Sequence, residues 1–291
     1  MNQDILISVG IPVYNSETTI ARCLDSIIRQ THQNLEIIIS DNGSTDRTFD
    51  ICTSYAISDP RIVISKQEIN IGPAANFRFV LEQSHGEFFC WVASDDVRSP
   101  DFIFANQNFL IQHAGAAAST SPHVFLLPSN ETISGKSLSI CGELNHRVKE
   151  FLSDPWNSHA LFYSLFRREL LLEFPHLGRN FLAWDWAIIF HILQFGNIHR
   201  IDSGLITLQS GGQSNKVDAL KMSGVRGIKY LAPLSDFTAY VMNTFQKKNL
   251  KSILSTLLLL SKLHVKISKY EYLQVKHWFK YRLLEALQYF K

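Results

Sequence analysis

The stretch ILISVGIPVYN at residues 5–15 decides the fold, because a short apolar run there ends abruptly in polar residues. The run at 5–11 predicts a strand, and apolar residues at helical spacing within 17–29 predict a helix after it. The stretch LEIIISDNGS at 35–44 repeats the pattern, and a second helix is predicted over 46–56. Strands and helices therefore alternate from the start of the chain.

The alternation continues to residue 113, with predicted strands at 61–65 and 87–93 and predicted helices at 74–83 and 102–113. Strands that are apolar on both faces and alternate with helices favour a parallel sheet that is covered by helices. We therefore predict an α/β fold in which a twisted, mostly parallel sheet carries helices on both faces.

The pattern is weaker in the second half of the chain. Residues 114–155 contain one strand candidate at 123–127, and a regular apolar pattern resumes at 160–166. A helix is then predicted at 184–194 and a strand at 198–208, and from residue 217 the pattern is helical. We expect one continuous fold with a C-terminal helical extension.

Composition excludes several classes of protein. The chain has 291 residues, of which 46% are hydrophobic and 19% charged, unlike collagen-like, disordered or disulfide-scaffold proteins. Four widely spaced cysteines form no zinc or redox motif, so we expect buried free thiols in a reducing compartment. Without a recognisable signal peptide or long apolar run, we expect a cytoplasmic location, either free or at the inner face of the cell membrane.

The net charge of +2 gives no reason to expect a nucleic-acid partner, but its distribution is uneven. Residues 246–291 carry +8 and the rest of the chain −6. An apolar stripe lies among these lysines, which suits peripheral contact with an anionic membrane. Packing on the rest of the chain, or on a second copy in a homo-oligomer, gives the same stripe, and we favour packing for the stripe and membrane attraction for the charge. The stripe consists of Leu250, Ile253, Leu254, Leu257 and Leu258.

Polar pairs follow three of the predicted strands. Tyr14-Asn15, Asp41-Asn42 and Asp95-Asp96 each come directly after an apolar run, and ligands of parallel sheets bind at the carboxyl ends of strands. The alternative for any one pair is turn or helix-cap chemistry. Two adjacent carboxylates at Asp95 and Asp96 also repel each other, which favours a hard divalent cation beside them. We expect the three pairs to meet in one crevice.

Taken together, several segments resemble the family 2 glycosyltransferases with the GT-A fold. The resemblance covers about residues 1–115, and it is carried by 8–15, 26–31, 38–46, 70–72, 86–88 and 93–96. It implies inverting transfer of a sugar from a nucleotide diphosphate sugar (UDP, GDP or dTDP) to a hydroxyl of a glycan or lipid-linked glycan. Polysaccharide or glycolipid synthesis is the setting that it suggests.

The resemblance also implies roles for single residues. Those implied to bind the nucleotide are Pro12, Tyr14, Asp41, Asn42 and Asp95. Asp96 is the implied ligand of Mn²⁺ or Mg²⁺. Many relatives have an aspartate where this chain has Ala93 and another where it has Asn42, so metal affinity and base preference stay open.

An inverting displacement needs a general base, and the resemblance points to Asp185. Relatives carry a Glu-Asp pair at this place, whereas Trp184 replaces the glutamate here. The alternative is an aspartate in the first helical turn that only stabilises the helix dipole. Trp184 and Trp186 suit either a sugar-stacking surface or the core.

The resemblance divides the chain into three regions. We expect residues 1–115 to bind the nucleotide sugar, 116–215 to bind the acceptor, and 216–291 to form the helical region. The loop at 210–214 is expected to be a lid over the diphosphate or an ordinary glycine-rich turn. One rival function is a catalytically silent sugar-nucleotide-binding protein. A sugar-1-phosphate nucleotidyltransferase is the other, although its glycine-rich, basic phosphate loop is missing from 11–16.

Overall fold

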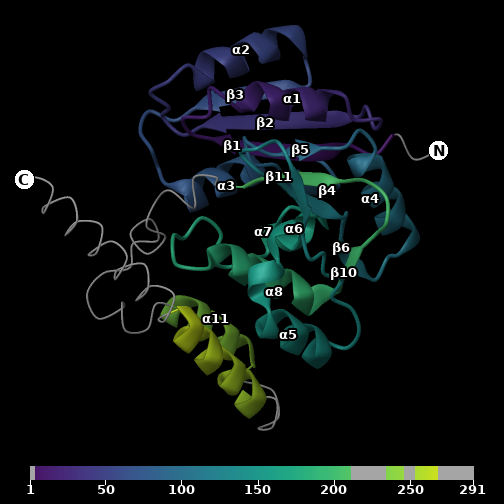
Figure 1. Cartoon of the computed structure of the whole chain (residues 1–291), viewed down its shortest axis with the longest axis vertical. Coiled ribbons are helices and arrows are strands. Elements are labelled where there is room, and N and C mark those ends of the chain that lie inside the picture. The colour runs from purple at the N-terminus through teal and green to yellow at the C-terminus, as the bar shows by residue number, and fades with distance from the viewer. Residues whose placement is uncertain (1–3, 211–233, 246–252, 268–291) are drawn as a thin grey trace, which may run out of the picture.

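The computed structural model describes residues 4–210, 234–245 and 253–267 (Figure 1). A seven-stranded sheet forms the centre of this part. Its strands lie in the order β10 (Asn197–Arg200), β6 (Ala116–Thr120), β9 (Leu165–Arg167), β4 (Phe88–Trp91), β1 (Ile7–Val13), β2 (Leu35–Asp41) and β3 (Ile62–Lys66). Neighbouring strands are parallel except that β9 runs antiparallel to both β4 and β6. The predicted mostly parallel sheet is therefore confirmed.

Helices cover both faces of this sheet, as predicted (Figure 1). One core cluster joins the strands to α1 (Ile20–Ile28), α2 (Thr48–Ser58) and α4 (Phe102–Gln112). The other joins them to α3 (Pro73–Glu82) and to later helices. Every residue of β1 is buried, which explains its unbroken apolar run. A Cβ on Gly10 would lie 2.6 Å from the Phe89 ring of β4 and 2.7 Å from Val80 of α3, so the close packing of this helix on the sheet requires glycine.

The second half departs from the prediction. The weakly patterned segment contains β6 and α5 (Leu144–Ser153), which were not predicted. Residues 160–166 belong to two elements, α6 (His159–Phe162) and β9. Short elements also flank these, namely the 3₁₀ turn η1 (Pro155–Asn157) and α7 (Arg168–Leu172). The helix predicted at 184–194 is present as α8 (Trp184–Phe195).

A second, smaller sheet lies beside the first. Its strands are β5 (Val97–Arg98), β11 (Ile206–Gln209), β7 (His123–Leu126) and β8 (Thr132–Ser134), in that order. The single strand predicted at 198–208 is wrong, because this segment supplies β10 to one sheet and β11 to the other. The chain bends between them at Gly204, which has a φ of +76°. This bend brings the end of β11 beside the residues that follow β4.

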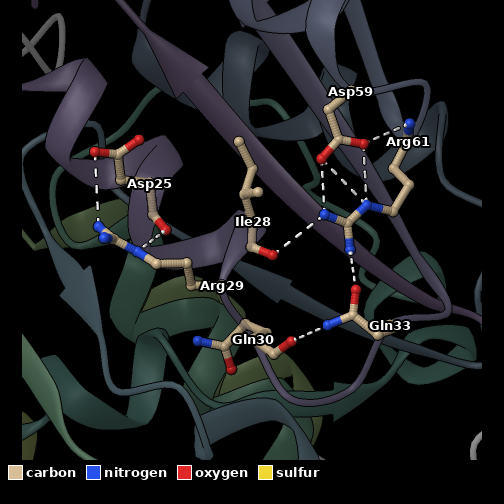
Figure 2. A network of polar contacts seen from close by, with 7 residues as sticks. All are labelled: Asp25, Ile28, Arg29, Gln30, Gln33, Asp59 and Arg61. Carbon is tan, nitrogen blue, oxygen red and sulfur yellow. Dashed lines mark hydrogen bonds and ion pairs between the residues drawn. The ribbon is translucent and has the colours of Figure 1, made fainter.

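The amino ends of β2 and β3 are joined by a network around Arg61, which Figure 2 shows. Its guanidinium donates to the carbonyl of Ile28 at 3.2 Å, to Gln33 Oε1 at 3.1 Å and to Asp59 Oδ2 at 2.7 Å. The loop after α1 and the loop after α2 are thereby fixed to each other. The network lies at the opposite end of the strands from the polar pairs.

Two helical segments of the C-terminal region pack against the core around α8. Helix α11 (Ser235–Phe245) contacts α8, and residues 253–267 bury Leu260, Leu263 and Ile267. Lys266 Nζ lies 4.0 Å from the centroid of the Trp156 ring. The helical extension is thus present where the structure describes it. No helix within the described ranges is long and apolar enough to span a bilayer.

The residues of the predicted apolar stripe differ in how exposed they are. Leu254, Leu257 and Leu258 are exposed, whereas Ile253 is half-buried against the core. A neighbouring face of the same helix makes the packing contacts. Leu250 and the loop at 211–214 lie outside the described residues.

Candidate active site

Three polar loops meet at the carboxyl end of the central sheet. Strands β4, β1 and β2 are adjacent and parallel, so the segments that follow them leave the sheet side by side. Tyr14 and Asn15 follow β1, Asp41 ends β2, and Asp95 and Asp96 follow β4. The structure therefore brings these predicted residues together.

Hydrogen bonds join the three loops directly. The amide of Asn15 donates to Ser44 Oγ at 2.9 Å, and the amide of Thr45 donates to Asn15 Oδ1 at 2.9 Å. Ser16 Oγ lies 2.7 Å from Ser94 Oγ, which connects the loop after β1 to the loop after β4. Asn15 has a φ of 48°, a left-handed conformation that asparagine tolerates better than most residues. The loops thus form one fixed frame.

Asp41 and Asn42 are both buried, but they differ in how their side chains are bonded. Asp41 Oδ2 accepts the Ser44 amide at 3.1 Å, while Oδ1 finds no hydrogen-bond partner among the described residues. In the side chain of Asn42, Nδ2 donates to Asn70 Oδ1 at 3.1 Å, and Oδ1 accepts from the backbone amide of Ile71 at 2.8 Å. Asn42 therefore holds the loop at 70–72 in place, and Asp41 keeps one buried acceptor that no described residue uses.

A pocket of about 440 Å³ opens beside Asp41, at the carboxyl ends of β2 and β3. The Gln67 amide donates to the Asp41 carbonyl at 2.8 Å, which fixes one wall of the pocket. The contribution of β3 was not predicted, although the strand predicted at 61–65 ends directly before these polar residues. The pocket is lined by Gly43, Ser44, Thr45, Lys66, Gln67 and Glu68.

Pro12 and Tyr14 frame the same end of the sheet. Pro12 is buried within β1 and lies opposite Ser40 of β2, so it is a strand residue rather than a loop residue. Tyr14 is half-buried at the first position after that strand. The backbone at this point is next to the loop that follows β2, because the Asn15 amide donates to Ser44 Oγ.

Asp96 is 4% exposed and lies between the two sheets. Its Oδ1 accepts the amide of Gln209 at 3.2 Å, and its Oδ2 lies 3.9 Å from Nη1 of the buried Arg98. Burial raises the pKa of Asp96 to about 7, the charge of Asp95 adds to the rise, and Arg98 opposes it. Helix α4 begins after Asp101, so neither Asp95 nor Asp96 caps it.

Asp96 fits one ligand position of a hard divalent ion. Within the described ranges its Oδ2 is buried with no hydrogen-bond partner, and an oxygen of this kind suits Mg²⁺ or Mn²⁺. The same part of the chain contains no group of three or more His, Cys, Asp or Glu that could hold a metal. Oxygens of a bound diphosphate and water would have to supply most of the other ligands.

Gln209 and Arg22 belong to the site but were not predicted. Besides its bond to Asp96, Gln209 accepts from Arg22 Nη2 at 2.9 Å and donates to the Leu126 carbonyl at 3.2 Å. Arg22 Nη2 also donates to the Asp95 carbonyl at 3.0 Å. These bonds attach the end of β11 to the acidic loop. The one signal for Gln209 is its place directly after the strand predicted at 198–208. No pattern in the sequence indicates a role for Arg22.

Asp185 lies half-buried in the first turn of α8, directly after Ala183 and Trp184. Ala183 has a φ of 66°, a strained conformation for alanine that sets the start of the helix. Burial raises the pKa of Asp185, whereas the Trp186 amide and the charge of His159 lower it. The position suits both predicted roles, a proton acceptor and a first-turn helix residue.

Tyr163 lies directly after α6, and its ring centroid is 5.5 Å from the Arg98 guanidinium. The pKa of its phenol is raised by burial and further by the negative charges of Asp96, Asp95 and Asp185, whereas Arg98 lowers it.

The tryptophans beside Asp185 are core residues. Trp184 packs on Phe77 and Phe162, with ring centroids 5.2 and 5.4 Å away, and Trp186 packs on Trp156 at 5.0 Å. Both belong to the cluster on the α8 face of the sheet. The contacts support the core interpretation of the two residues.

Comparison with known proteins gives a consistent result. The family model described as glycosyl transferase family 2 matches residues 8–172. Glycosyltransferase GlyG of Streptococcus pneumoniae serotype 4 is 37% identical over 98 residues, which are 34% of this chain and 33% of GlyG. The poly(ribitol-phosphate) beta-glucosyltransferase of Bacillus spizizenii is 37% identical over 106 residues, 35% of this chain and 17% of that protein. These matches cover a third or less of each relative.

A solved structure extends the likeness over most of the chain. S. aureus TarS 1–349 in complex with UDP-GlcNAc superposes with a TM-score of 0.64 and 18% identity. The superposition covers 88% of this chain and 70% of that one. At this identity the likeness shows the fold, which is of the GT-A type.

Proposed function

The chain belongs to the family 2 glycosyltransferases, and we propose that it transfers a sugar from a nucleotide diphosphate sugar to an acceptor hydroxyl with inversion. The observation that carries the proposal is the meeting of the loops after β4, β1 and β2 around Asp96 and Asp41. Both aspartates are buried, and each has one carboxylate oxygen without a hydrogen-bond partner among the described residues. Buried acceptors of this kind are costly unless a ligand uses them.

We assign the nucleotide to the end of the sheet formed by β1 and β2. Asp41 would accept an N–H of the base, Tyr14 would stack on the base, and Pro12 would shape the strand beneath them. Asn42 would act through the loop at 70–72 that it holds, and Asp95 would contact the ribose or the diphosphate. The pocket beside Asp41 favours a base at this place. UDP, GDP and dTDP are the candidate carriers.

The divalent ion is proposed to be Mn²⁺ or Mg²⁺, held by Asp96 together with the diphosphate. When bound, such an ion stabilises the negative charge that develops on the leaving diphosphate. Asp96 would orient the diphosphate, and Gln209 would keep the Asp96 carboxylate in position through its amide hydrogen bond.

Asp185 is the proposed general base. It would take the proton of the acceptor hydroxyl on the side of the sugar away from the diphosphate. Burial raises its pKa toward the working range of an enzyme, which strengthens a carboxylate as a base. Its place in the first turn of α8, where the resemblance to the family puts the base, supports this assignment.

The acceptor side is proposed from weaker features. A glycan or lipid-linked glycan, in polysaccharide or glycolipid synthesis, agrees with the name of the Bacillus spizizenii relative. The helical region would touch the inner face of a membrane or a second subunit through the exposed Leu254, Leu257 and Leu258. The exposed Lys262 follows them on the same helix. In this scheme residues 1–115 bind the donor, 116–215 bind the acceptor, and 216–291 form the attached helical region.

The test is a panel of UDP-, GDP- and dTDP-sugars with Mn²⁺, which scores thermal stabilisation and slow hydrolysis of the donor. An inverting enzyme releases the opposite anomer first, which ¹H NMR detects before mutarotation. We expect Asp185→Asn to keep donor binding and to lose at least 100-fold in hydrolysis, whereas Asp96→Asn loses both. The exposed Asp202→Asn is the matched control.

Three results would count against the proposal. A chain that is stabilised by none of these donors does not use a nucleotide sugar. A chain that binds a donor but hydrolyses it equally well with Asp185→Asn has its base elsewhere, and one that binds without any turnover is a silent binding protein.

A further inference from the structure

Arg98 is a buried cation whose burial the proposed transfer does not explain. Its side chain is 0% exposed, and its guanidinium lies between the rings of Phe102 and Tyr163, 5.4 and 5.5 Å from their centroids. One N–H donates to the carbonyl of Val97 at 3.3 Å. Nε and Nη2 have no hydrogen-bond partner in the described part of the chain. A guanidinium with five N–H groups is costly to bury in this state, so its retention needs a reason.

The backbone fixes Arg98 in this place. Its amide donates to Ser26 Oγ of α1 at 3.2 Å, and the residue pairs with Ile206 across β5 and β11. The flanking rings are held by α4 and by the segment between α6 and β9. The guanidinium is therefore a fixed charge and not one arm of a mobile surface side chain.

The charge that Arg98 faces is Asp96. Nη1 lies 3.9 Å from Asp96 Oδ2, with both side chains buried, and this distance is that of an ion pair and too long for a hydrogen bond. Oδ2 is also the oxygen that fits a divalent ion. Any cation on that oxygen would share it with the guanidinium, and two like charges in a buried setting disfavour each other.

A second observation concerns the supply of ligands. The residues that the structure describes offer Asp96 without a group of three metal-binding side chains around it. A hard divalent ion needs about six oxygen ligands, so the protein leaves most positions to the diphosphate and water. The diphosphate would also bring the negative charge that offsets Arg98.

We propose that Arg98 is a positioning residue that keeps divalent metal from Asp96 until the nucleotide diphosphate arrives, so that metal and donor bind together. The proposal rests on the donor site proposed above. Asp96 stays paired with Arg98 in the free protein, and the diphosphate then tips the balance of charge in favour of the metal.

The test measures Mn²⁺ binding to the whole chain from the loss of the free-ion EPR signal, with and without saturating UDP, after subtraction of the loss that UDP causes without protein. It compares the wild type with Arg98→Met, which keeps an unbranched side chain but removes the charge, and with Arg98→Lys, which keeps the charge. We expect wild-type protein to bind Mn²⁺ at least tenfold more tightly with UDP. Arg98→Met should gain at least tenfold in Mn²⁺ affinity without UDP, and Arg98→Lys should resemble the wild type.

A folded Arg98→Met protein whose UDP-free affinity for Mn²⁺ equals or falls below that of the wild type would overturn the proposal. Wild-type protein that binds Mn²⁺ equally well with and without UDP would do so too, even if Arg98→Met does not fold. If the chain binds no nucleotide, the donor assignment fails, while the UDP-free comparison still decides the role of Arg98.

Discussion

At the scale of single residues, position along a predicted strand was enough to find half of the site. Asp41, Asp95 and Asp96 were predicted because each follows an apolar run, and the structure places them at one end of the sheet. Arg22 and Gln209 are 187 residues apart in the chain, so no local pattern could pair them. Arg98 was missed for a different reason, because its significance depends on the burial of both charges and not on their spacing in the chain.

The side chain of Asp41 predicts opposite effects on binding and stability. Asp41→Asn removes a buried carboxylate that has one acceptor unused by the described residues, so we expect the melting temperature to stay equal or to rise. Nucleotide binding should weaken about tenfold or more, because a hydrogen bond to a charged group is worth about 1.5 to 3 kcal/mol. Calorimetry with UDP, GDP and dTDP measures the affinity, and scanning calorimetry measures the melting temperature.

The control for this experiment is Asp50→Asn, an exposed change in the first turn of α2. An Asp41→Asn protein that binds the nucleotide as tightly as the wild type would show that Asp41 does not contact the base.

At the scale of elements, prediction succeeded where strands and helices alternate strictly. Strands β1 and β4 are buried along their whole length, because both faces of the parallel sheet are covered there. Strand β6 escaped notice because it is made of Ala116, Ala117, Ala118, Ser119 and Thr120, which are small residues with a weak apolar signal. Residues 198–208 appeared continuous because the bend at Gly204 interrupts the pattern only briefly.

The Arg61 network predicts a large effect from one partly buried ion pair and a small effect from an exposed one (Figure 2). In Arg61–Asp59 the side chains are 21% and 12% exposed, whereas in Arg29–Asp25 they are 70% and 47% exposed. We expect Arg61→Met to cost about 1 to 3 kcal/mol of the free energy of unfolding, because Asp59, Gln33 and the Ile28 carbonyl lose a shared donor.

Arg29→Met is the matched control, and it should cost less than about 1 kcal/mol. Urea unfolding of both variants gives the two values. Neither change should alter nucleotide affinity, since the network lies at the amino end of the strands. Equal losses of stability for the two variants would contradict this ranking.

At the scale of the whole molecule, a buried histidine connects helix α11 of the C-terminal region to helix α8. His191 of α8 lies 2.9 Å from the Leu170 carbonyl through Nε2 and 3.0 Å from the Tyr240 hydroxyl of α11 through Nδ1. A neutral ring can donate at Nε2 and accept at Nδ1, which satisfies both partners. Burial lowers the pKa of His191 to about 4, and that of His123 to about 4 as well.

The sign of the pH dependence follows from these values. Between pH 6.5 and about 4 the unfolded chain binds protons that folded His191 refuses, so this histidine destabilises the fold as the pH falls. Asp96 acts in the opposite direction, because its raised pKa lets the folded chain bind a proton first. The total pH profile therefore mixes opposing contributions, and a variant is needed to isolate the histidine.

His191→Gln supplies that variant, because an amide can still donate to Leu170 and accept from Tyr240 but does not titrate. We expect the wild type to lose stability relative to His191→Gln as the pH falls from 7 to 4.5. The loss in the free energy of unfolding should be about 1.4 kcal/mol for each pH unit below the ordinary histidine pKa. Urea unfolding at stepped pH measures the difference. A constant difference between the two proteins across this range would show that His191 is not held neutral at the junction of α8 and α11.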